Sequence, residues 1–140
     1  MANQLAMTVM DAVAEAHDVH HPISTALYFE QQHAAAVTAS EQFRSHRMPA
    51  WLAYFDAARQ GEWLLGDTLS YADLLLFQLL DGLQYAFPRA SARLTPSSLR
   101  GLHGRVKTLP RVAAYLASPR RIAYNESGLF RHYPELDDPA

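Results

Sequence analysis

Cysteine is absent from the 140 residues, which excludes a disulfide framework, a thiolate metal site and a cysteine nucleophile. Long hydrophobic runs are also absent, because no apolar stretch approaches the roughly 18 residues that a membrane span needs. No Lys or Arg precedes Arg44, so the basic segment that begins a secretory signal peptide is missing. These absences predict a soluble, cytoplasmic protein that does not contact a membrane.

β-branched residues are scarce. Val, Ile and Thr number 6, 2 and 6, whereas Leu alone numbers 19. Sheets favour β-branched residues and helices favour Leu and Ala, so the composition predicts an all-α fold. Hydrophobic residues make up 49% and charged residues 19%, which excludes a disordered chain. The length fits one domain, which we place at 1–140.

Lysine occurs once, at Lys107, beside 11 arginines, and the charges are unevenly distributed. Residues 1–43 carry five acids and no Lys or Arg, whereas residues 44–131 carry 12 bases and six acids. Either an anion-binding surface or neutralisation between parts of the domain explains this pattern. We favour internal neutralisation and expect no nucleic-acid partner, because aromatic residues do not interleave with the arginines.

Proline, glycine and capping residues divide the chain into expected helices. Pro22 interrupts the first helix, and Pro49 is expected to kink the third, with Ser40 or Thr38 as its cap and Gly61 near its end. The aromatic-rich tail of about 118–140 is expected to pack back on the bundle. The expected helices span about 3–20, 23–39, 40–60, 71–86, 97–108 and 111–117.

The strongest local pattern opens the helix expected over 71–86. Ser70 stands three residues before Asp73, which is the spacing of a capping box with Asp in place of Glu or Gln. Leu69 and Leu74 are placed to form the accompanying hydrophobic staple. The helix that follows is apolar on nearly all sides, which predicts the buried centre of a bundle.

These segments together resemble the C-terminal all-helical domain of cytosolic glutathione transferases. Residues 65–73 resemble the buried capping-box motif of that family, and residues 99–116, with Leu109-Pro110 and Tyr115-Leu116, resemble the two helices after it. Residues 11–18 resemble the first helix of the sigma-like class. The resemblance implies a bundle of about five or six helices.

A complete family member begins with a thioredoxin-like domain of roughly 80 residues that carries most of the glutathione site. No such unit is expected here, so the isolated chain is not expected to be active. The resemblance implies an electrophile-binding and dimerisation domain, with glutathione as co-substrate of the full enzyme and no other cofactor. Its partners would be a hydrophobic electrophile and a second copy or a thioredoxin-like domain.

The alternative function is a non-enzymatic protein-interaction module with the same helical fold. The place of the largest apolar pocket separates the two hypotheses. A pocket against the side of the first helix that carries Met10 and His17 favours the enzyme, and a flat apolar patch elsewhere favours a partner surface.

The first helix carries an acidic stripe, because Asp11, Glu15 and Asp18 fall within about 60° of one another on a helical wheel. The resemblance implies that an acid on this helix pairs with the α-amino group of glutathione bound to the partner subunit. Glu15 and Asp18 are the best placed, with Asp11 beside them. A solvated face remains the simpler interpretation of the same stripe.

The resemblance also implies that the neighbouring side of the helix faces the electrophile pocket. Its residues are Met7, Met10, Ala14, His17 and His21.

A metal site is the alternative interpretation of the histidines near this end of the helix. Asp18-x-x-His21 and Glu30-x-x-His33 are similar to the Glu-x-x-His pairs of di-iron bundles, but only the second contains a Glu. We therefore expect no metal. His20 and His21 are expected instead to cap the helix C-terminus as partly protonated imidazoles.

Overall fold

A computed structural model describes residues 1–139. Within these residues the fold is a bundle of seven α-helices without a β-strand, which confirms the predicted all-α class. The helices of the first half are α1 (Ala2–Asp18), α2 (His33–Gln42), α3 (Met48–Ala58) and α4 (Tyr71–Ala86). Those of the second half are α5 (Pro88–Leu94), α6 (Ser97–Thr108) and α7 (Pro110–Leu116).

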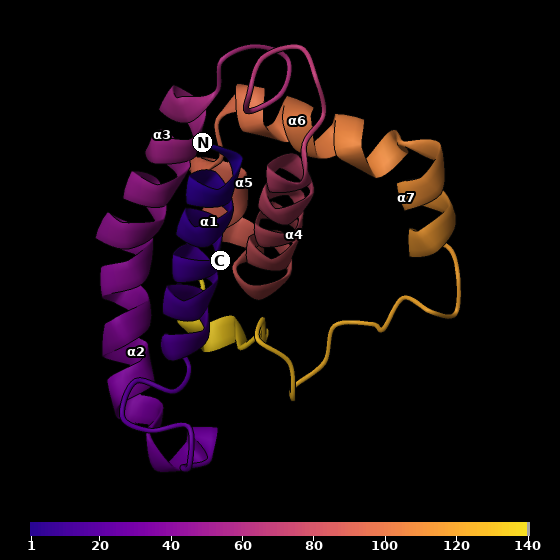
Figure 1. Cartoon of the computed structure of the whole chain (residues 1–140). Coiled ribbons are helices and arrows are strands. Elements are labelled where there is room, and N and C mark those ends of the chain that lie inside the picture. Colours follow the sequence, from indigo (N-terminus) through magenta and orange to yellow (C-terminus); the bar gives the residue numbers. More distant parts are fainter. Residues whose placement is uncertain (140) are drawn as a thin grey trace.

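Helix α4 lies at the centre of the bundle, against α1, α5 and α6 (Figure 1). Ser70 and Asp73 form a capping box at its first turn. The Asp73 carboxylate is fully buried, and its Oδ2 accepts the Ser70 backbone N–H and hydroxyl, each at 2.8 Å. Its Oδ1 accepts the backbone N–H of Leu64 at 2.8 Å, so it also holds the preceding loop.

Helix α1 packs one stripe of small and branched apolar residues against α4. These side chains recur at helical spacing, so a single face of the helix is removed from water. The buried residues are Leu5, Ala6, Val9, Ala12, Val13 and Ala16.

The expected helices over 23–39 and 40–60 are wrong in their boundaries. Residues 21–32 form a loop with one short 3-10 turn, η1 (Phe29–Gln31), because the buried Gln32 amide replaces the backbone partners of a helix. Gln32 Oε1 accepts the N–H of Ile23 at 2.9 Å, and Gln32 Nε2 donates to the Ser24 carbonyl at 3.0 Å.

Helices α2 and α3 form one rod, joined by a π-helical segment, η2 (Phe43–Arg47) (Figure 1). The π-turn lies directly before Pro49, whose ring cannot accommodate the regular hydrogen-bond ladder. Ser40 and Thr38 therefore lie inside a continuous helix and do not cap one. Their hydroxyls donate to backbone carbonyls, that of Ser40 to Val37 at 2.8 Å. The rod ends at Ala58, before Gly61.

Helix α5 was not expected from the sequence. Pro88 stands at its first turn, and the carboxylate of Asp137 accepts the backbone N–H groups of Arg89 and Ala90 at 2.8 and 3.1 Å. The cap thus comes from the far end of the chain.

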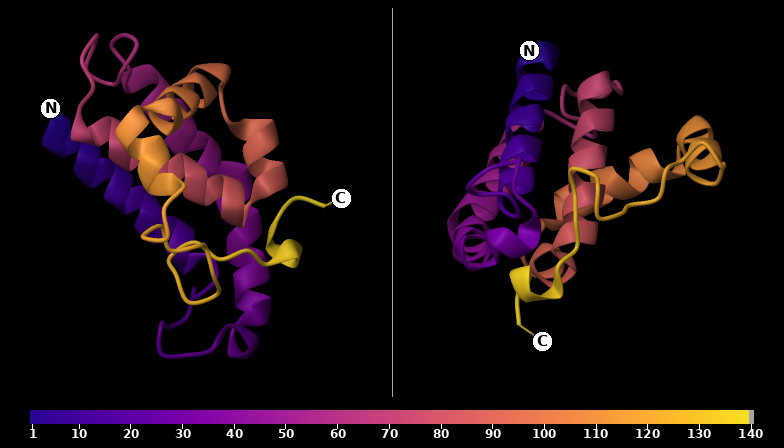
Figure 2. Two further views of the ribbon diagram at one scale, coloured as in Figure 1. Left: turned by 90° about the vertical axis from the view of Figure 1, so that its right-hand side faces the viewer. Right: turned by 90° about the horizontal axis from the view of Figure 1, so that it is seen from below.

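The tail returns from α7 along the bundle toward the end of α1 (Figure 2). Phe130 is buried against Gly82 of α4, where a Cβ would lie 2.4 Å from the aromatic ring. The last turn of the tail within the described residues, η3 (Pro134–Leu136), packs against α2. Asp138 forms ion pairs with Arg44 and Arg93 at 2.5 and 2.7 Å. The acidic end of the chain thus neutralises part of its basic middle.

Candidate functional site

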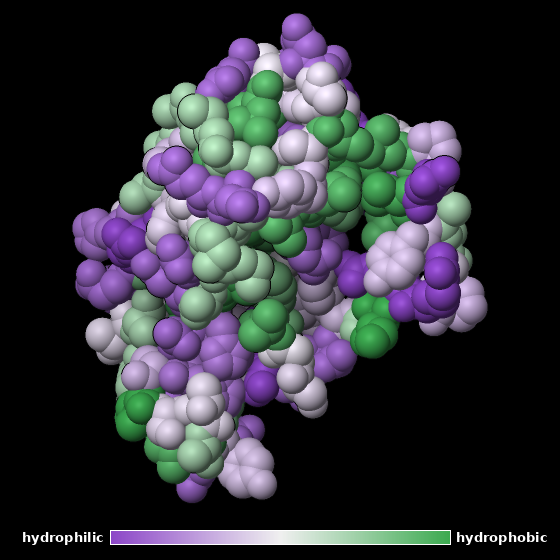
Figure 3. Space-filling view, viewed as in Figure 1, coloured by the Kyte–Doolittle hydropathy of each residue, from purple (hydrophilic) through white to green (hydrophobic). Residues whose placement is uncertain are grey.

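An apolar cavity of about 280 Å³ opens between α1, α4 and the tail. The space-filling view shows this hollow beside α1 on the face seen in Figure 1 (Figure 3). Residues 122–125 and 128–130 of the tail form its outer wall. The residues that line it from the two helices are Val9, Met10, Val13, Leu75 and Gln78.

Tyr124 closes one side of the cavity and is fixed by a polar cluster on α4 and α6. Its hydroxyl donates to Asp81 Oδ2 at 2.9 Å, and His103 lies 3.0 Å from Asp81 Oδ1. The His103 hydrogen bond is the main reason why the pKa of Asp81 lies below its usual range. Burial, with the Asp81 charge beside it, raises the pKa of Tyr124 to about 12. Tyr124 is therefore a neutral hydrogen-bond donor at ordinary pH.

The five residues predicted for an electrophile pocket are not gathered in this cavity. Met10 lines it, whereas Met7, Ala14, His17 and His21 lie outside its lining. The outer wall comes from the tail, which the sequence predicted to pack back on the bundle, with plain packing preferred over a border of the substrate pocket. Its residues were therefore not among those predicted for the pocket.

The acidic stripe lies on a different side of α1 from the cavity. Glu15 is held within its own chain: Arg47 donates to both carboxylate oxygens at 2.7 and 3.0 Å, and Trp51 Nε1 donates at 2.9 Å. The hydrogen bond from Arg47 is the main reason why the pKa of Glu15 is lowered. Asp11 and Asp18 lie exposed. A shallow depression of about 310 Å³ reaches both Glu15 and Asp18.

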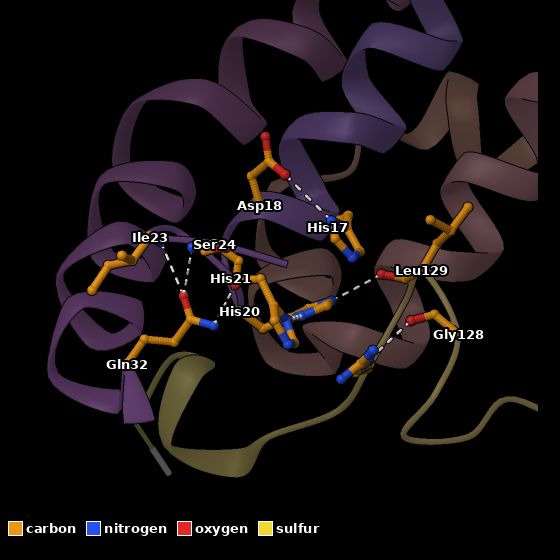
Figure 4. A network of polar contacts seen from close by, with 10 residues as sticks. His17, Asp18, His20, His21, Ile23, Ser24, Gln32, Gly128 and Leu129 are labelled. Carbon is orange, nitrogen blue, oxygen red and sulfur yellow. Dashed lines mark hydrogen bonds and ion pairs between the residues drawn. The ribbon is translucent and has the colours of Figure 1, made fainter. Parts of the chain in front are cut away.

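Three histidines meet at the C-terminal end of α1 (Figure 4). His20 and His21 are buried, their Nδ1 atoms lie 2.5 Å apart, and His20 Nε2 lies 3.0 Å from the Leu129 carbonyl oxygen. The ring of His17 stacks on that of His21 with centroids 5.6 Å apart. Asp18 Oδ1 lies 3.3 Å from His17 Nδ1.

The expected role of His20 and His21 as partly protonated helix caps is wrong. Burial lowers the pKa of His20 to about 4, so its imidazole is neutral at ordinary pH and cannot offer a cation to the helix dipole. Burial is also the main cause of the lowered pKa of His21. His20 bonds the tail through Leu129 instead of the last carbonyls of α1.

A second apolar depression, of about 460 Å³, lies at the start of α4 and the junction of α6 and α7. Leu69 and Leu74, predicted as a hydrophobic staple, are both exposed there. The residues that line it are Leu69, Leu74, Leu109, Pro110, Arg111 and Val112.

The sequence of residues 17–119 matches the family described as "Glutathione S-transferase, C-terminal domain". This match covers well over half of the chain, including the capping box and helices α2 to α7. The chain belongs to this family. The predicted resemblance to the helical domain of glutathione transferases is thereby confirmed. The match does not assign the chain to a class within that family.

A related protein from Plasmodium yoelii yoelii, named "Glutathione S-transferase", is 24% identical over 110 residues. The aligned part covers 76% of this chain and 48% of the Plasmodium protein. The chain therefore spans about half the length of this glutathione S-transferase. In the residues that the structure describes, no helix combines the length and apolarity needed to cross a membrane.

Proposed function

We propose that this chain is the hydrophobic-substrate half of a glutathione transferase, and that the cavity between α1, α4 and the tail binds an apolar electrophile. The larger of the two apolar hollows, about 460 Å³ around Leu74 and Val112, lies elsewhere, so volume alone favours the alternative function. The observation that carries the present proposal is instead the position of the cavity of about 280 Å³. It lies against the side of α1 that presents Met10, where the family membership leads one to look for substrate. Apolar walls with few polar groups are typical of small-molecule sites.

The polar groups of the cavity suit orientation of a ligand more than chemistry on it. Gln78 Nε2 lies 3.3 Å from the Tyr124 hydroxyl, and Tyr124 remains protonated. Neither group is an activated nucleophile or base. The thiolate of glutathione would therefore be generated elsewhere in the full enzyme, and this chain would position the electrophile that it attacks.

We further propose that the chain pairs with a second copy and that Asp18 reaches glutathione bound to that copy. The side chain of Asp18 is 68% exposed, whereas both oxygens of Glu15 already accept hydrogen bonds from Arg47 and Trp51. Asp11 is exposed about two turns before Asp18 and is the second candidate. Sedimentation of the purified chain measures its mass in solution and should give that of a dimer. The mass of a monomer at high protein concentration would contradict the pairing.

Binding of an apolar aromatic dye, followed by fluorescence, tests the cavity. Met10→Lys places a charge in the lining and should weaken binding by about tenfold or more, the equivalent of about 1.4 kcal/mol. Met7→Lys is the matched control, because Met7 is 65% exposed on the same helix but lies outside the lining. Equal effects of the two variants, or no effect of Met10→Lys, would refute the proposed cavity.

The second candidate function is a protein-interaction module. The exposed apolar depression around Leu74 and Val112 favours it, because a monomer rarely leaves such a patch open without a partner. If this surface were the binding site, dye binding would be lost in Val112→Lys and retained in Met10→Lys.

A further inference from the structure

The cluster of His17, His20 and His21 is not used by the proposed electrophile site. Each residue offers one ring nitrogen, and these three atoms lie within 4.8 Å of one another. The residues come from one helix end and the turn after it, so their backbone positions are fixed by α1 (Figure 4).

Hydrogen bonds decide which ring nitrogen of His17 and of His20 keeps a free lone pair. The Leu129 carbonyl can only accept, so His20 Nε2 carries a proton, and a neutral His20 has its lone pair on Nδ1. Asp18 accepts from His17 Nδ1, which leaves the lone pair of His17 on Nε2. A carbonyl or carboxylate on the outer nitrogen is the arrangement that supports metal-binding histidines.

We propose that His17, His20 and His21 form a mononuclear site for a divalent transition metal, with Zn²⁺ as the reference ion. The ligands would be His17 Nε2, His20 Nδ1 and His21 Nδ1. The His21 Nδ1 proton, which now bridges to His20 Nδ1 over 2.5 Å, would move to His21 Nε2. A fourth position would remain open to water or a small anion.

Small side-chain movements bring the three nitrogens to metal-binding distances. Zn–N bonds of about 2.0–2.1 Å in a tetrahedron place the nitrogens about 3.4 Å apart. The Nδ1 atoms of His20 and His21 must separate by about 0.9 Å, and a pair of ring nitrogens at the 4.8 Å limit of the cluster must close by about 1.4 Å. Rotation about the side-chain torsions supplies such shifts without moving the helix.

The ligand set selects the class of metal. Three imidazoles without a thiolate suit Zn²⁺, Ni²⁺ and Cu²⁺, whereas Mg²⁺ and Ca²⁺ require oxygen ligands. The charged groups around the cluster are Asp18, Glu30 and Arg131. The two acids favour a cation and Arg131 opposes it, so Arg131→Gln should raise the affinity for Zn²⁺ several-fold.

The site would join α1 to the wall of the apolar cavity. His20 already bonds the carbonyl of Leu129, and Leu129 also lines the cavity. A metal on His20 would fix that hydrogen bond and with it the position of this part of the tail.

Titration of the untagged 140-residue chain with Zn²⁺ by calorimetry tests the site, with Co²⁺ absorption as a second measurement. We expect one ion per chain, a tetrahedral Co²⁺ spectrum that Zn²⁺ abolishes, and a rise in melting temperature with Zn²⁺. His17→Gln should lower the affinity at least about tenfold. The His17 side chain is 19% exposed, and circular dichroism would show that the variant folds.

His33→Gln is the matched control, because it removes an exposed imidazole outside the cluster. It should leave Zn²⁺ affinity and the melting shift unchanged. The proposal is overturned if Zn²⁺ does not bind or change the melting temperature of the folded chain. It is also overturned if His33→Gln weakens Zn²⁺ binding as much as His17→Gln does. That result would mean that Zn²⁺ binds to scattered surface histidines and not to the cluster.

Discussion

Replacement of Asp73 by Ala tests the role of the capping box that opens α4. The carboxylate is fully buried and serves three donors: the backbone N–H groups of Leu64 and Ser70, and the Ser70 hydroxyl, all at 2.8 Å. Loss of the cap costs about 1 kcal/mol. The Leu64 N–H is left without its partner at a buried residue, which adds about 1–3 kcal/mol.

We therefore expect Asp73→Ala to lower the free energy of unfolding by about 2–4 kcal/mol. Ser70→Ala removes only a hydroxyl on a partly exposed residue, so its cost should be nearer 1 kcal/mol. Asp67→Ala is the control in the same loop, because Asp67 is exposed and should change stability by less than about 0.5 kcal/mol.

Urea unfolding followed by circular dichroism at 222 nm measures these differences. The three variants should share the wild-type dependence on urea concentration, so that changes in midpoint report stability alone. The reasoning would be refuted if Asp73→Ala unfolded within about 0.5 kcal/mol of wild type, or if Asp67→Ala cost as much.

Three other predictions follow from the packing and from the chain's chemistry. Gly82→Ala should destabilise the fold by about 1–3 kcal/mol, because its Cβ would meet the Phe130 ring. Gly104→Ala on α6 has no heavy atom within 4 Å and should be neutral or stabilising in the same urea assay, and equal costs would contradict the tail packing. His20 has a folded pKa of about 4, below its value of 6.5 in the unfolded chain, so acid favours unfolding. The unfolding free energy should fall as pH drops from 6.5 to 4, with a smaller fall in His20→Gln, and identical pH profiles would refute this role of His20. The 140-residue chain alone should not conjugate glutathione to an aryl halide in an absorbance assay, because its cavity holds no group that activates the thiol. Turnover at an ordinary enzymatic rate would contradict the proposed division of labour.

Local patterns were sufficient to predict the centre of the bundle. The Ser70–Asp73 spacing and Leu-rich run predicted the bounds of α4, and α6 also has its expected bounds. In both helices, residues close by in the sequence determine where the helix starts, where it ends and which face is apolar.

Elements that depend on distant partners could not be predicted. The loop over 21–32 is stabilised by the Gln32 side chain, and α5 is capped by Asp137 from 47 and 48 residues away. Helix propensity considers only the local residues, which include Ala and Ser in the loop over 21–32 and Pro and Arg in α5. Neither composition indicates where a buried amide or carboxylate will lie.

The candidate site shows the same division. Helical spacing placed Met10 and the acids on neighbouring faces of α1. It could not show that Arg47 and Trp51 donate hydrogen bonds to the Glu15 carboxylate. The contact between the rings of His20 and His21 was not predicted, because consecutive residues on a helix point in different directions. Their rings meet only because the helix ends at Asp18 and the chain turns.

Methyl-resolved NMR of the chain with an apolar aryl ligand tests the central claim most directly. The account predicts that the methyl signals of Met10 and Leu75 shift in a saturable way while those of Leu74 and Val112 do not, because only the first pair lines the cavity beside α1. Saturable shifts confined to Leu74 and Val112, or none at any of the four, would contradict it.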